Sequence, residues 1–186
     1  MRLAVVGAGA VGRSVVELAG EHGHDVVAVA DSSSAIVADE ADSGGVDTEA
    51  VVTRKAAAGI VGDDDPADVL AADYDVLVEA TPTTLGDAEP GFGHVRAALE
   101  RDRHVVLANK GPVAERYADV RALEAASDGS VYFEATVGGA MPVLSTIADF
   151  GPDRITAVRG VLNGTANFVL SRMAAEGLGY EHVLAE

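Results

Sequence analysis

The sequence predicts an α/β protein, in which a doubly wound, mostly parallel sheet is followed by an incomplete α+β domain. Three observations predict this class. Short apolar runs typical of buried strands alternate with helical patterns, the first run leads directly into a glycine-rich turn, and the alternation ends near residue 134. We therefore expect one domain over residues 1–134 and the start of a second over residues 135–186, which has too few elements to bury its own apolar faces.

The first strand and the turn after it carry the most informative motif. Residues 3–6 are apolar, and the glycines that follow have the spacing G-x-G-x-x-G, the fingerprint of a dinucleotide-binding Rossmann fold. The first glycine permits a tight turn, the second lets the backbone approach a pyrophosphate, and the third lets the next helix lie close to the sheet. The phosphates would lie on the free N–H groups at the positive end of that helix. The residues expected to hold this part of a cofactor are Gly7, Gly9, Ala10, Val11 and Gly12.

The second strand ends in an acidic residue. A helical pattern over residues 11–19 stops at Gly23, and residues 25–30 form the next apolar run. Asp31 follows about 20 residues after the last glycine of the motif, where a carboxylate accepts hydrogen bonds from the adenosine ribose hydroxyls. Because that carboxylate would repel a 2′-phosphate, the sequence favours NAD over NADP.

NADP stays open as the alternative cofactor. The serines at positions 32–34 could hydrogen-bond a phosphate, and Arg13, Arg54 or Lys55 could supply positive charge. Both dinucleotides are therefore candidates, with NAD favoured.

The chain then continues the alternation of helices and strands. Residues 38–45 are typical of a surface loop or short helix. The elements expected next are a weak helix followed by a turn over 48–62, a short helix over 67–72, a strand over 75–80, a helix over 92–102, a strand over 104–108, a helix over 113–126 and a strand over 131–135.

The tip after the strand 75–80 is rich in hydroxyl groups. Pro82 cannot continue a strand ladder, so residues 81–84 are expected to project from the carboxyl edge of the sheet, where ligands bind in such folds. Thr81 is therefore a candidate to face the cofactor, with a plain capping threonine as the alternative.

The pattern changes beyond residue 134. We expect a helix over residues 142–150, a half-exposed strand over 154–162, an amphipathic helix over 166–175 and one more helix from about residue 177.

The protein is strongly acidic, with a net charge of −17 at pH 7 and a pI near 4.4. This charge argues against nucleic acid or an anionic membrane as a partner. Among the 13 basic residues the lysines are Lys55 and Lys110, and the others are arginines. Such an acid-rich, lysine-poor composition is typical of halophilic proteins from a salt-saturated cytoplasm. An ordinary acidic cytosolic protein from a GC-rich genome is the alternative.

The sequence contains no cysteine, which excludes disulfides, thiolate catalysis and Cys-ligated zinc. Its first residues lack the charged and apolar regions of a signal peptide, and it has no 18-residue apolar run. We therefore expect a cytoplasmic protein.

Four blocks of sequence, taken in order, resemble homoserine dehydrogenase. They are Gly-Ala-Gly-Ala-Val-Gly at 7–12, Ala-Asn-Lys at 108–110, Glu-Ala-Thr-Val-Gly-Gly-Ala-Met-Pro at 134–142 and Gly-Val-Leu-Asn-Gly-Thr at 160–165. The resemblance covers essentially the whole chain. It implies an oxidoreductase that interconverts L-aspartate 4-semialdehyde and L-homoserine with NAD or NADP, on the route to threonine and methionine.

The resemblance assigns roles to residues near two strand ends. It implies that Lys110 lies between the nicotinamide and the substrate, where a cation could hold a carboxylate or polarise a carbonyl. A surface lysine without such a role is the alternative. Asn163, Gly164 and Thr165 resemble the turn that lines the substrate cleft, although Thr165 could simply cap the helix after it.

The resemblance also implies a monovalent cation. Glu134 would supply a carboxylate, and Val137, Gly139 and Met141 would supply backbone carbonyls. One carboxylate with several carbonyls suits sodium or potassium better than zinc. Such an ion would brace the junction between the two domains, whereas a strand-end glutamate facing solvent is the alternative.

The chain also departs from the family pattern. In the family, the acidic residues that hold homoserine and the lysine proposed as general acid/base lie further along than residue 186, and so do most contacts of the dimer. The resemblance therefore implies a homo-oligomer for the full-length protein. For this polypeptide alone it implies dinucleotide binding with little or no dehydrogenase activity.

Two alternative functions remain open. An NAD-sensing Rossmann module, like the regulatory domains of potassium transporters, begins with the same glycine motif but needs neither the block at 108–110 nor the block at 134–142. Another small amino-acid dehydrogenase or reductase, such as aspartate dehydrogenase or dihydrodipicolinate reductase, has a related build.

Overall fold

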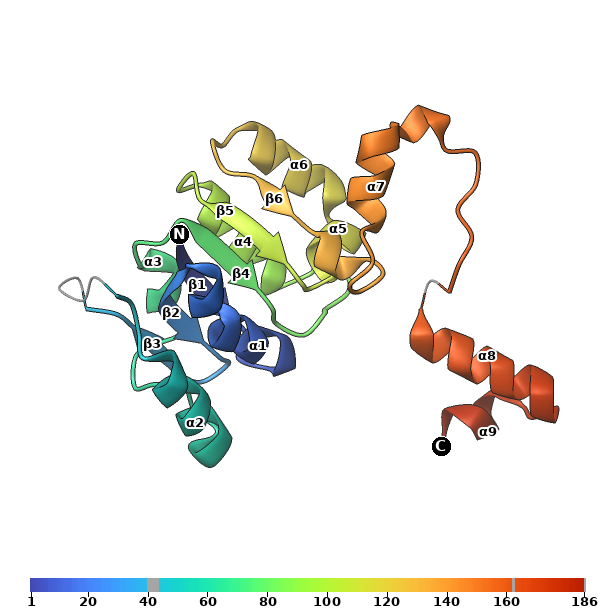
Figure 1. Cartoon of the computed structure of the whole chain (residues 1–186), viewed down its shortest axis with the longest axis horizontal. Helices are drawn as coiled ribbons and strands as arrows, with labels where there is room; N and C mark the ends of the chain where they lie inside the picture. Colours follow the sequence, from blue (N-terminus) through green and yellow to red (C-terminus); the bar gives the residue numbers. More distant parts are fainter. Residues whose placement is uncertain (40–43, 162, 186) are drawn as a thin grey trace. The chain divides into compact units, whose positions relative to one another are not determined.

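A computed structural model describes residues 1–39, 44–161 and 163–185 of the chain. It divides into two compact units, Met1–Thr136 and Val137–Glu186, each of which is described by itself (Figure 1).

The first unit is built on a six-stranded sheet with the order β3-β2-β1-β4-β5-β6. Its strands are β1 (Arg2–Val6), β2 (Asp25–Ala30), β3 (Ala35–Val37), β4 (Val76–Glu79), β5 (His104–Leu107) and β6 (Val131–Tyr132). All neighbouring pairs are parallel except β2 and β3, which are antiparallel. The predicted doubly wound, mostly parallel sheet is confirmed.

Helices cover both faces of this sheet (Figure 1). Those of the first unit are α1 (Ala10–Leu18), α2 (Thr48–Ala58), α3 (Asp68–Ala71), α4 (Gly91–Leu99), α5 (Gly111–Glu115) and α6 (Tyr117–Ala125), with the 3₁₀ turns η1 (Gly20–His22) and η2 (Glu134–Thr136). One apolar core contains residues of α1 and α2, and the other contains residues of α3, α4 and α6.

The apolar runs form strands because both faces of the sheet are buried. Four of the five residues of β1 are buried, as are all four residues of β4. Alternate residues of a strand then enter opposite cores: Val5 belongs to the core with α1, and Ala4 belongs to the core with α4.

Three details of the first unit differ from the predictions. β3 was not predicted, because a three-residue edge strand gives almost no periodic signal. The helix predicted over 113–126 is two helices, since Arg116 leaves the helical conformation and lies over the ring of Phe92 at 4.1 Å. The strand predicted over 131–135 ends at Tyr132, because the N–H and hydroxyl of Thr136 both donate to the carbonyl of Phe133 and close a tight turn.

The described part of the second unit is helical. Its elements are α7 (Val143–Phe150), the 3₁₀ turn η3 (Pro152–Arg154), α8 (Gly164–Glu176) and α9 (Tyr180–Leu184). The strand predicted over 154–162 is wrong for the described residues 155–161, which are irregular, and position 162 lies outside the described residues. An alternating pattern indicates a strand, but a strand also needs a neighbour to accept its backbone hydrogen bonds. The other described elements of this unit are helices and offer none.

Part of the surface loop predicted over 38–45 also lies outside the described residues, at positions 40–43. In the described part of the chain, no helix is both long enough and apolar enough to cross a membrane.

Candidate functional site

A pocket of about 790 Å³ opens at the carboxyl edge of the sheet, beside the ends of β1, β2 and β4. Its lining comes from the glycine-rich turn, from the residues after β2 and β4, and from α2, α3 and α4. The predicted cofactor residues that line it are Gly7, Gly9, Ala10, Val11, Asp31 and Thr81. The structure therefore brings together residues that are up to 74 positions apart in the chain.

The glycine-rich turn leaves the pocket free of side chains at its base. Gly7 has a φ of +102°, and a Cβ there would lie 2.5 Å from the carbonyl oxygen of Ala80. Gly9 caps α1 with an extended backbone, and a Cβ there would meet no described atom within 4 Å. The first N–H groups of α1 lack intrahelical partners and lie at the positive end of the helix dipole, so this end of the pocket suits an anion.

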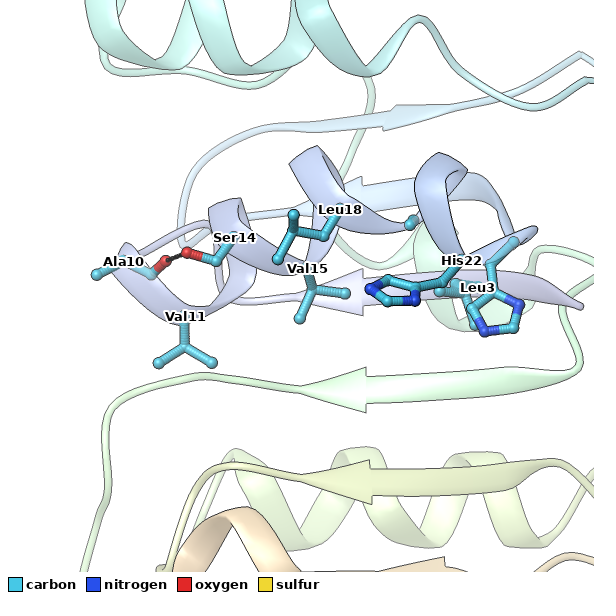
Figure 2. A pocket seen from close by; sticks show the side chains of 9 residues that line it. Leu3, Ala10, Val11, Ser14, Val15, Leu18 and His22 are labelled. Atoms are coloured by element: carbon cyan, nitrogen blue, oxygen red, sulfur yellow. Dashed lines mark hydrogen bonds between the residues drawn. The ribbon is translucent and has the colours of Figure 1, made fainter. Parts of the chain in front are cut away.

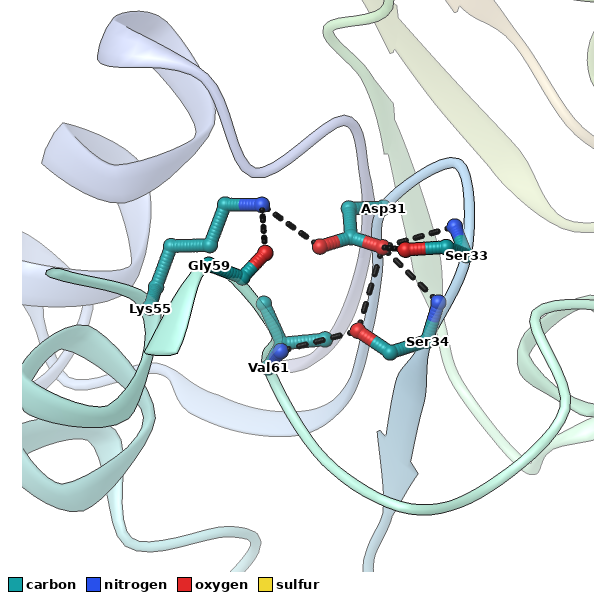
Figure 3. Close-up of polar contacts among 6 residues, drawn as sticks. All are labelled: Asp31, Ser33, Ser34, Lys55, Gly59 and Val61. Atoms are coloured by element: carbon teal, nitrogen blue, oxygen red, sulfur yellow. Dashed lines mark hydrogen bonds and ion pairs between the residues drawn. The ribbon is translucent and has the colours of Figure 1, made fainter. Parts of the chain in front are cut away.

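Asp31 follows β2 and is held from two sides (Figure 3). Its Oδ1 accepts from the backbone N–H groups of Ser33 and Ser34, both at 2.8 Å, and from the Ser34 hydroxyl at 3.1 Å. Its Oδ2 accepts from Lys55 Nζ at 2.6 Å. Burial by itself would raise the pKa of Asp31, but the hydrogen bonds from Lys55, Ser33 and Ser34 outweigh it and lower that pKa from 3.8 to about 2. The carboxylate is therefore ionised throughout the neutral range.

A buried polar network ties the ends of β4 and β5 together. Glu79 is fully buried, and its Oε1 accepts from the hydroxyl of Thr81. Thr81 Oγ1 in turn accepts from Asn109 Nδ2 at 3.0 Å, and Asn109 Oδ1 accepts from the N–H of Gly111 at 2.8 Å. His94 Nδ1 lies 3.4 Å from the same Glu79 oxygen. Thr81 thus faces the pocket and also links two strand ends.

Lys110 stands next to this network, at the start of α5. Its side chain is exposed, and its backbone N–H donates to Thr83 Oγ1 at 3.2 Å. Since Thr83 and Thr84 both follow β4, Lys110 lies at the same edge of the sheet as the pocket, although it is not one of the residues that line the cavity. A cation there is accessible to a ligand.

The residues predicted for a cation belong to different units. Glu134 is half-buried in η2 of the first unit, whereas Val137, Gly139 and Met141 belong to the second unit. Within the second unit, the Met141 carbonyl already accepts from the Val143 N–H at 2.9 Å. Among the described residues, no group of three or more His, Asp and Glu side chains comes together as a metal site.

The residues predicted for the substrate lie at the start of α8. Asn163 Oδ1 accepts from the Ala166 N–H at 2.8 Å and caps the helix, while Gly164 and Thr165 are already helical. The expectation that Thr165 is the cap is therefore wrong. The asparagine takes this role because its side-chain oxygen reaches the N–H three residues on.

Sequence reasoning missed several residues of the site. Pro66 in the turn before α3, Leu70 of α3 and His94 of α4 reach the pocket through tertiary packing. Lys55 of α2 was named only as one of three possible positive charges for a 2′-phosphate. Glu79 carried a signal that could have been used, since a carboxylate inside an apolar strand run needs partners when it is buried.

A second hollow, of about 590 Å³, runs along α1 (Figure 2). Val11 and Val15 project from one side of the helix into it, and His22 and Leu3 lie at its far end. Its lining is apolar except for Ser14, His22 and His24, and it includes neither Gly7 and Gly9 of the glycine-rich turn nor Asp31, all of which line the first pocket.

The parallel sheet, the glycine-rich turn at the start of α1 and the acidic residue after β2 define a dinucleotide-binding Rossmann protein. Family models agree with this class and make it narrower. Residues 7–134 match the family described as "Homoserine dehydrogenase, NAD binding domain", and residues 142–186 match "Homoserine dehydrogenase". The chain belongs to the homoserine dehydrogenase family.

Individual relatives agree with this assignment. A homoserine dehydrogenase of Methanocaldococcus jannaschii is 33% identical over 100% of this chain and 60% of its own length. An NAD(+)-dependent homoserine dehydrogenase of Pseudomonas canavaninivorans is 38% identical over 60% of this chain and 32% of its own length. The crystal structure of homoserine dehydrogenase from Thermoplasma acidophilum has a TM-score of 0.81 and 26% identity, over 100% of this chain and 59% of that one. The chain thus spans about 60% or less of these relatives.

Proposed function

We propose that this chain supplies the cofactor-binding part of an NAD(P)-dependent homoserine dehydrogenase, which interconverts L-aspartate 4-semialdehyde and L-homoserine for threonine and methionine synthesis. One observation carries the proposal: the glycine-rich turn, Asp31 and Thr81 line a single pocket, with Lys110 at the same edge of the sheet. In this reading, Met1–Thr136 is the dinucleotide domain and the second unit begins the substrate and dimerisation domain.

The pocket offers residues suited to each part of the cofactor. The N–H groups at the start of α1 would hold the pyrophosphate, and the open space at Gly9 lets it approach the backbone. Pro66 and Leu70 give an apolar wall suited to an adenine ring, next to Asp31. Thr81 and His94 lie towards Lys110, where the nicotinamide and the substrate would meet. When bound, the nicotinamide supplies or accepts the hydride.

Lys110 would act on the substrate through its charge. A cation beside a carbonyl stabilises the negative charge that develops on the oxygen as hydride arrives, or else it holds the substrate carboxylate. The hydrogen bond from its backbone N–H to Thr83 fixes the start of α5 and therefore the base of this side chain. Asn163, Gly164 and Thr165 would line the substrate side of the cleft.

We propose NAD as the preferred cofactor. Asp31 is ionised and lines the pocket, so it attracts ribose hydroxyls and opposes a 2′-phosphate. The Pseudomonas canavaninivorans relative, which is named as NAD(+)-dependent, supports the same choice.

Further parts of the proposal rest on donor chemistry and composition. Glu134 with the carbonyls of Val137, Gly139 and Met141 is a donor set suited to sodium or potassium. The full-length protein would be a homodimer in a salt-rich cytoplasm, given its net charge of −17.

A fluorescence titration of the 186-residue chain with NADH and NADPH, followed by homoserine, tests the function. We expect NADH to bind and homoserine to cause no response, since this chain spans only 60% of the Methanocaldococcus jannaschii enzyme. Gly9→Val should abolish NADH binding because its side chain would fill the pyrophosphate position. Gly20→Val is the matched control, because Gly20 lies outside the pocket and a Cβ there meets no described atom within 4 Å.

The outcomes separate the candidate functions. NADH binding lost in Gly9→Val and kept in Gly20→Val supports a dinucleotide site. Appreciable oxidation of homoserine by this polypeptide with NAD would contradict the expected lack of turnover. An NAD-sensing module is favoured instead if a chain extended to the length of the relatives binds NADH but still does not respond to homoserine.

A further inference from the structure

Glu79 is a buried acid beside the dinucleotide pocket that the proposed function does not use. It is the last residue of β4, and its side chain is fully buried. Its Oε1 accepts from the hydroxyl of Thr81 and, at 3.3 Å, from the N–H of the same residue. Its Oε2 is buried as well and has no hydrogen-bond partner among the described residues. Because Oε1 presents lone pairs to both Thr81 groups, a third group that faces this oxygen has to be a donor.

His94 of α4 is that third group. Its Nδ1 lies 3.4 Å from Glu79 Oε1, and its side chain is 17% exposed. Since the carboxylate oxygen accepts, the ring proton lies on Nδ1. In a neutral imidazole with its proton on Nδ1, the other nitrogen, Nε2, is an acceptor.

The Nε2 atom of His94 is open to the pocket. The residue lines the cavity together with Thr81. In the part of the chain that the structure describes, Nε2 makes no hydrogen bond, and it is not one of the buried nitrogen atoms that lack a partner. It is therefore in contact with the space in which a ligand would lie. A ligand group that pairs with this atom has to bring an N–H or O–H, because Nε2 offers a lone pair.

The fixed tautomer favours one kind of ligand donor. A ribose hydroxyl can donate or accept, so it could pair with either tautomer of the histidine. An amino group attached to an aromatic ring or a carbonyl only donates, so it pairs with Nε2 only when that nitrogen carries no proton. A dinucleotide has two such groups, the amino group of adenine and the carboxamide NH2 of nicotinamide.

We propose that His94 Nε2 accepts a hydrogen bond from one of these exocyclic amino groups, and that Glu79 is the positioning residue that holds His94 in the accepting tautomer. The buried carboxylate thereby acts on the ligand through the histidine and does not touch it. This inference rests on the proposed function, since it requires the pocket to bind a dinucleotide.

The experiment compares three reduced dinucleotides on the whole 186-residue chain by isothermal titration calorimetry. They are NADH, deamino-NADH, which lacks the adenine amino group, and reduced 3-acetylpyridine adenine dinucleotide, in which a methyl group replaces the carboxamide NH2. His94→Phe keeps a ring but removes the acceptor. We expect this variant to weaken NADH about tenfold and to change the dissociation constant of one analogue by less than about twofold. The analogue that is insensitive to the substitution identifies the amino group that His94 binds.

Two further variants separate the loss of a hydrogen bond from a loss of structure. His22→Phe is the matched control, since His22 lines the hollow along α1 and not the dinucleotide pocket. It should leave all three dissociation constants within about twofold of the original chain. His94→Gln keeps an acceptor oxygen near the position of Nε2, so it should restore most of the NADH affinity that His94→Phe loses.

The tautomer can be measured without any substitution. The nitrogen-15 chemical shifts of the His94 ring distinguish a protonated from an unprotonated nitrogen. At about pH 8, above the ordinary pKa of histidine, we expect the proton on Nδ1 and none on Nε2. A proton on Nε2 would overturn the role of Glu79 whether or not the variants fold.

The binding results separate this inference from the proposed function. If His94→Phe weakens NADH and both analogues by the same factor, or leaves NADH unchanged, then the histidine does not bind an amino group and the inference fails alone. If the original chain does not bind NADH at all, the proposed function fails as well.

Discussion

Gly12 lies directly against the carbonyl oxygen of Gly7, so that a Cβ built on Gly12 would be 1.9 Å from that oxygen. The contact joins the first turn of α1 to the turn that leaves β1. It fixes the start of the helix at the end of the sheet, where its N–H groups open onto the pocket.

This contact predicts a loss of stability in Gly12→Ala. The added methyl group must push α1 away from the turn, at a cost of about 1–3 kcal/mol or more. Gly9→Ala is the control from the same motif, since its Cβ has open space, and its unfolding free energy should change by less than about 1 kcal/mol. Urea unfolding followed by circular dichroism measures both variants. Equal stability of the two would contradict the close contact.

Thr81→Val should destabilise the protein although it preserves the shape of the side chain. The substitution removes the hydroxyl between Glu79 and Asn109, so the buried Asn109 amide loses the acceptor of its Nδ2. Glu79 Oε1 keeps only longer contacts, from the Thr81 N–H at 3.3 Å and from His94 Nδ1 at 3.4 Å. A buried polar group left unpaired costs about 1–3 kcal/mol. Thr83→Val is the matched control: it removes a hydroxyl that accepts from Lys110, in an exposed position.

Chemical denaturation of both threonine variants tests this network. A loss in Thr81→Val no larger than that in Thr83→Val would mean that water replaces the missing hydroxyl and that the network contributes little.

The lowered pKa of Asp31 should make the free energy of unfolding depend on pH in the acid range. Its pKa is about 2 in the folded chain, below the ordinary 3.8. A lowered pKa contributes stability that is fully present above about pH 4 and is lost as the pH falls through 4 towards 2. The contribution is at most about 2 kcal/mol, and about half of it is gone at pH 3. Unfolding of the original chain and of Asp31→Asn should therefore differ more at pH 6 than at pH 3, and a constant difference would refute the assignment.

Salt should stabilise the fold. At a net charge of −17, like charges repel one another across the surface, and potassium chloride screens that repulsion. The melting temperature is expected to rise between dilute and molar potassium chloride. A melting temperature that does not change would remove the support for a halophilic protein and favour the ordinary acidic alternative.

Most of the sheet could be predicted because its strands are continuous apolar runs that end in glycine, proline or acidic residues. The antiparallel strand β3 could not be predicted, because three residues are too few to show the apolar–polar alternation of a strand. The segment 155–161 was predicted as a strand but is irregular. Apolar and polar residues alternate in it, but the described part of the second unit provides no neighbouring strand for it to pair with.

The site was predictable where it follows strand ends and not where it depends on helix placement. Gly7 and Asp31 come directly after a strand and Thr81 comes two residues after one, so their positions at one edge follow from the topology. The partner of Asp31 is Lys55, 24 residues further on in a helix of weak amphipathic pattern. Only the packing of α2 against α1 and the sheet brings it there.

The hydrogen bond from Asn109 to Thr81 has a consequence for how Lys110 meets a ligand. Lys110 is exposed, yet the residue before it is 1% exposed and the residue after it donates to the Asn109 side chain. The backbone on both sides of the lysine is therefore ordered when the chain folds, before any ligand arrives. A ligand that engages this ammonium has to immobilise only the side chain, so little loop entropy is lost on binding.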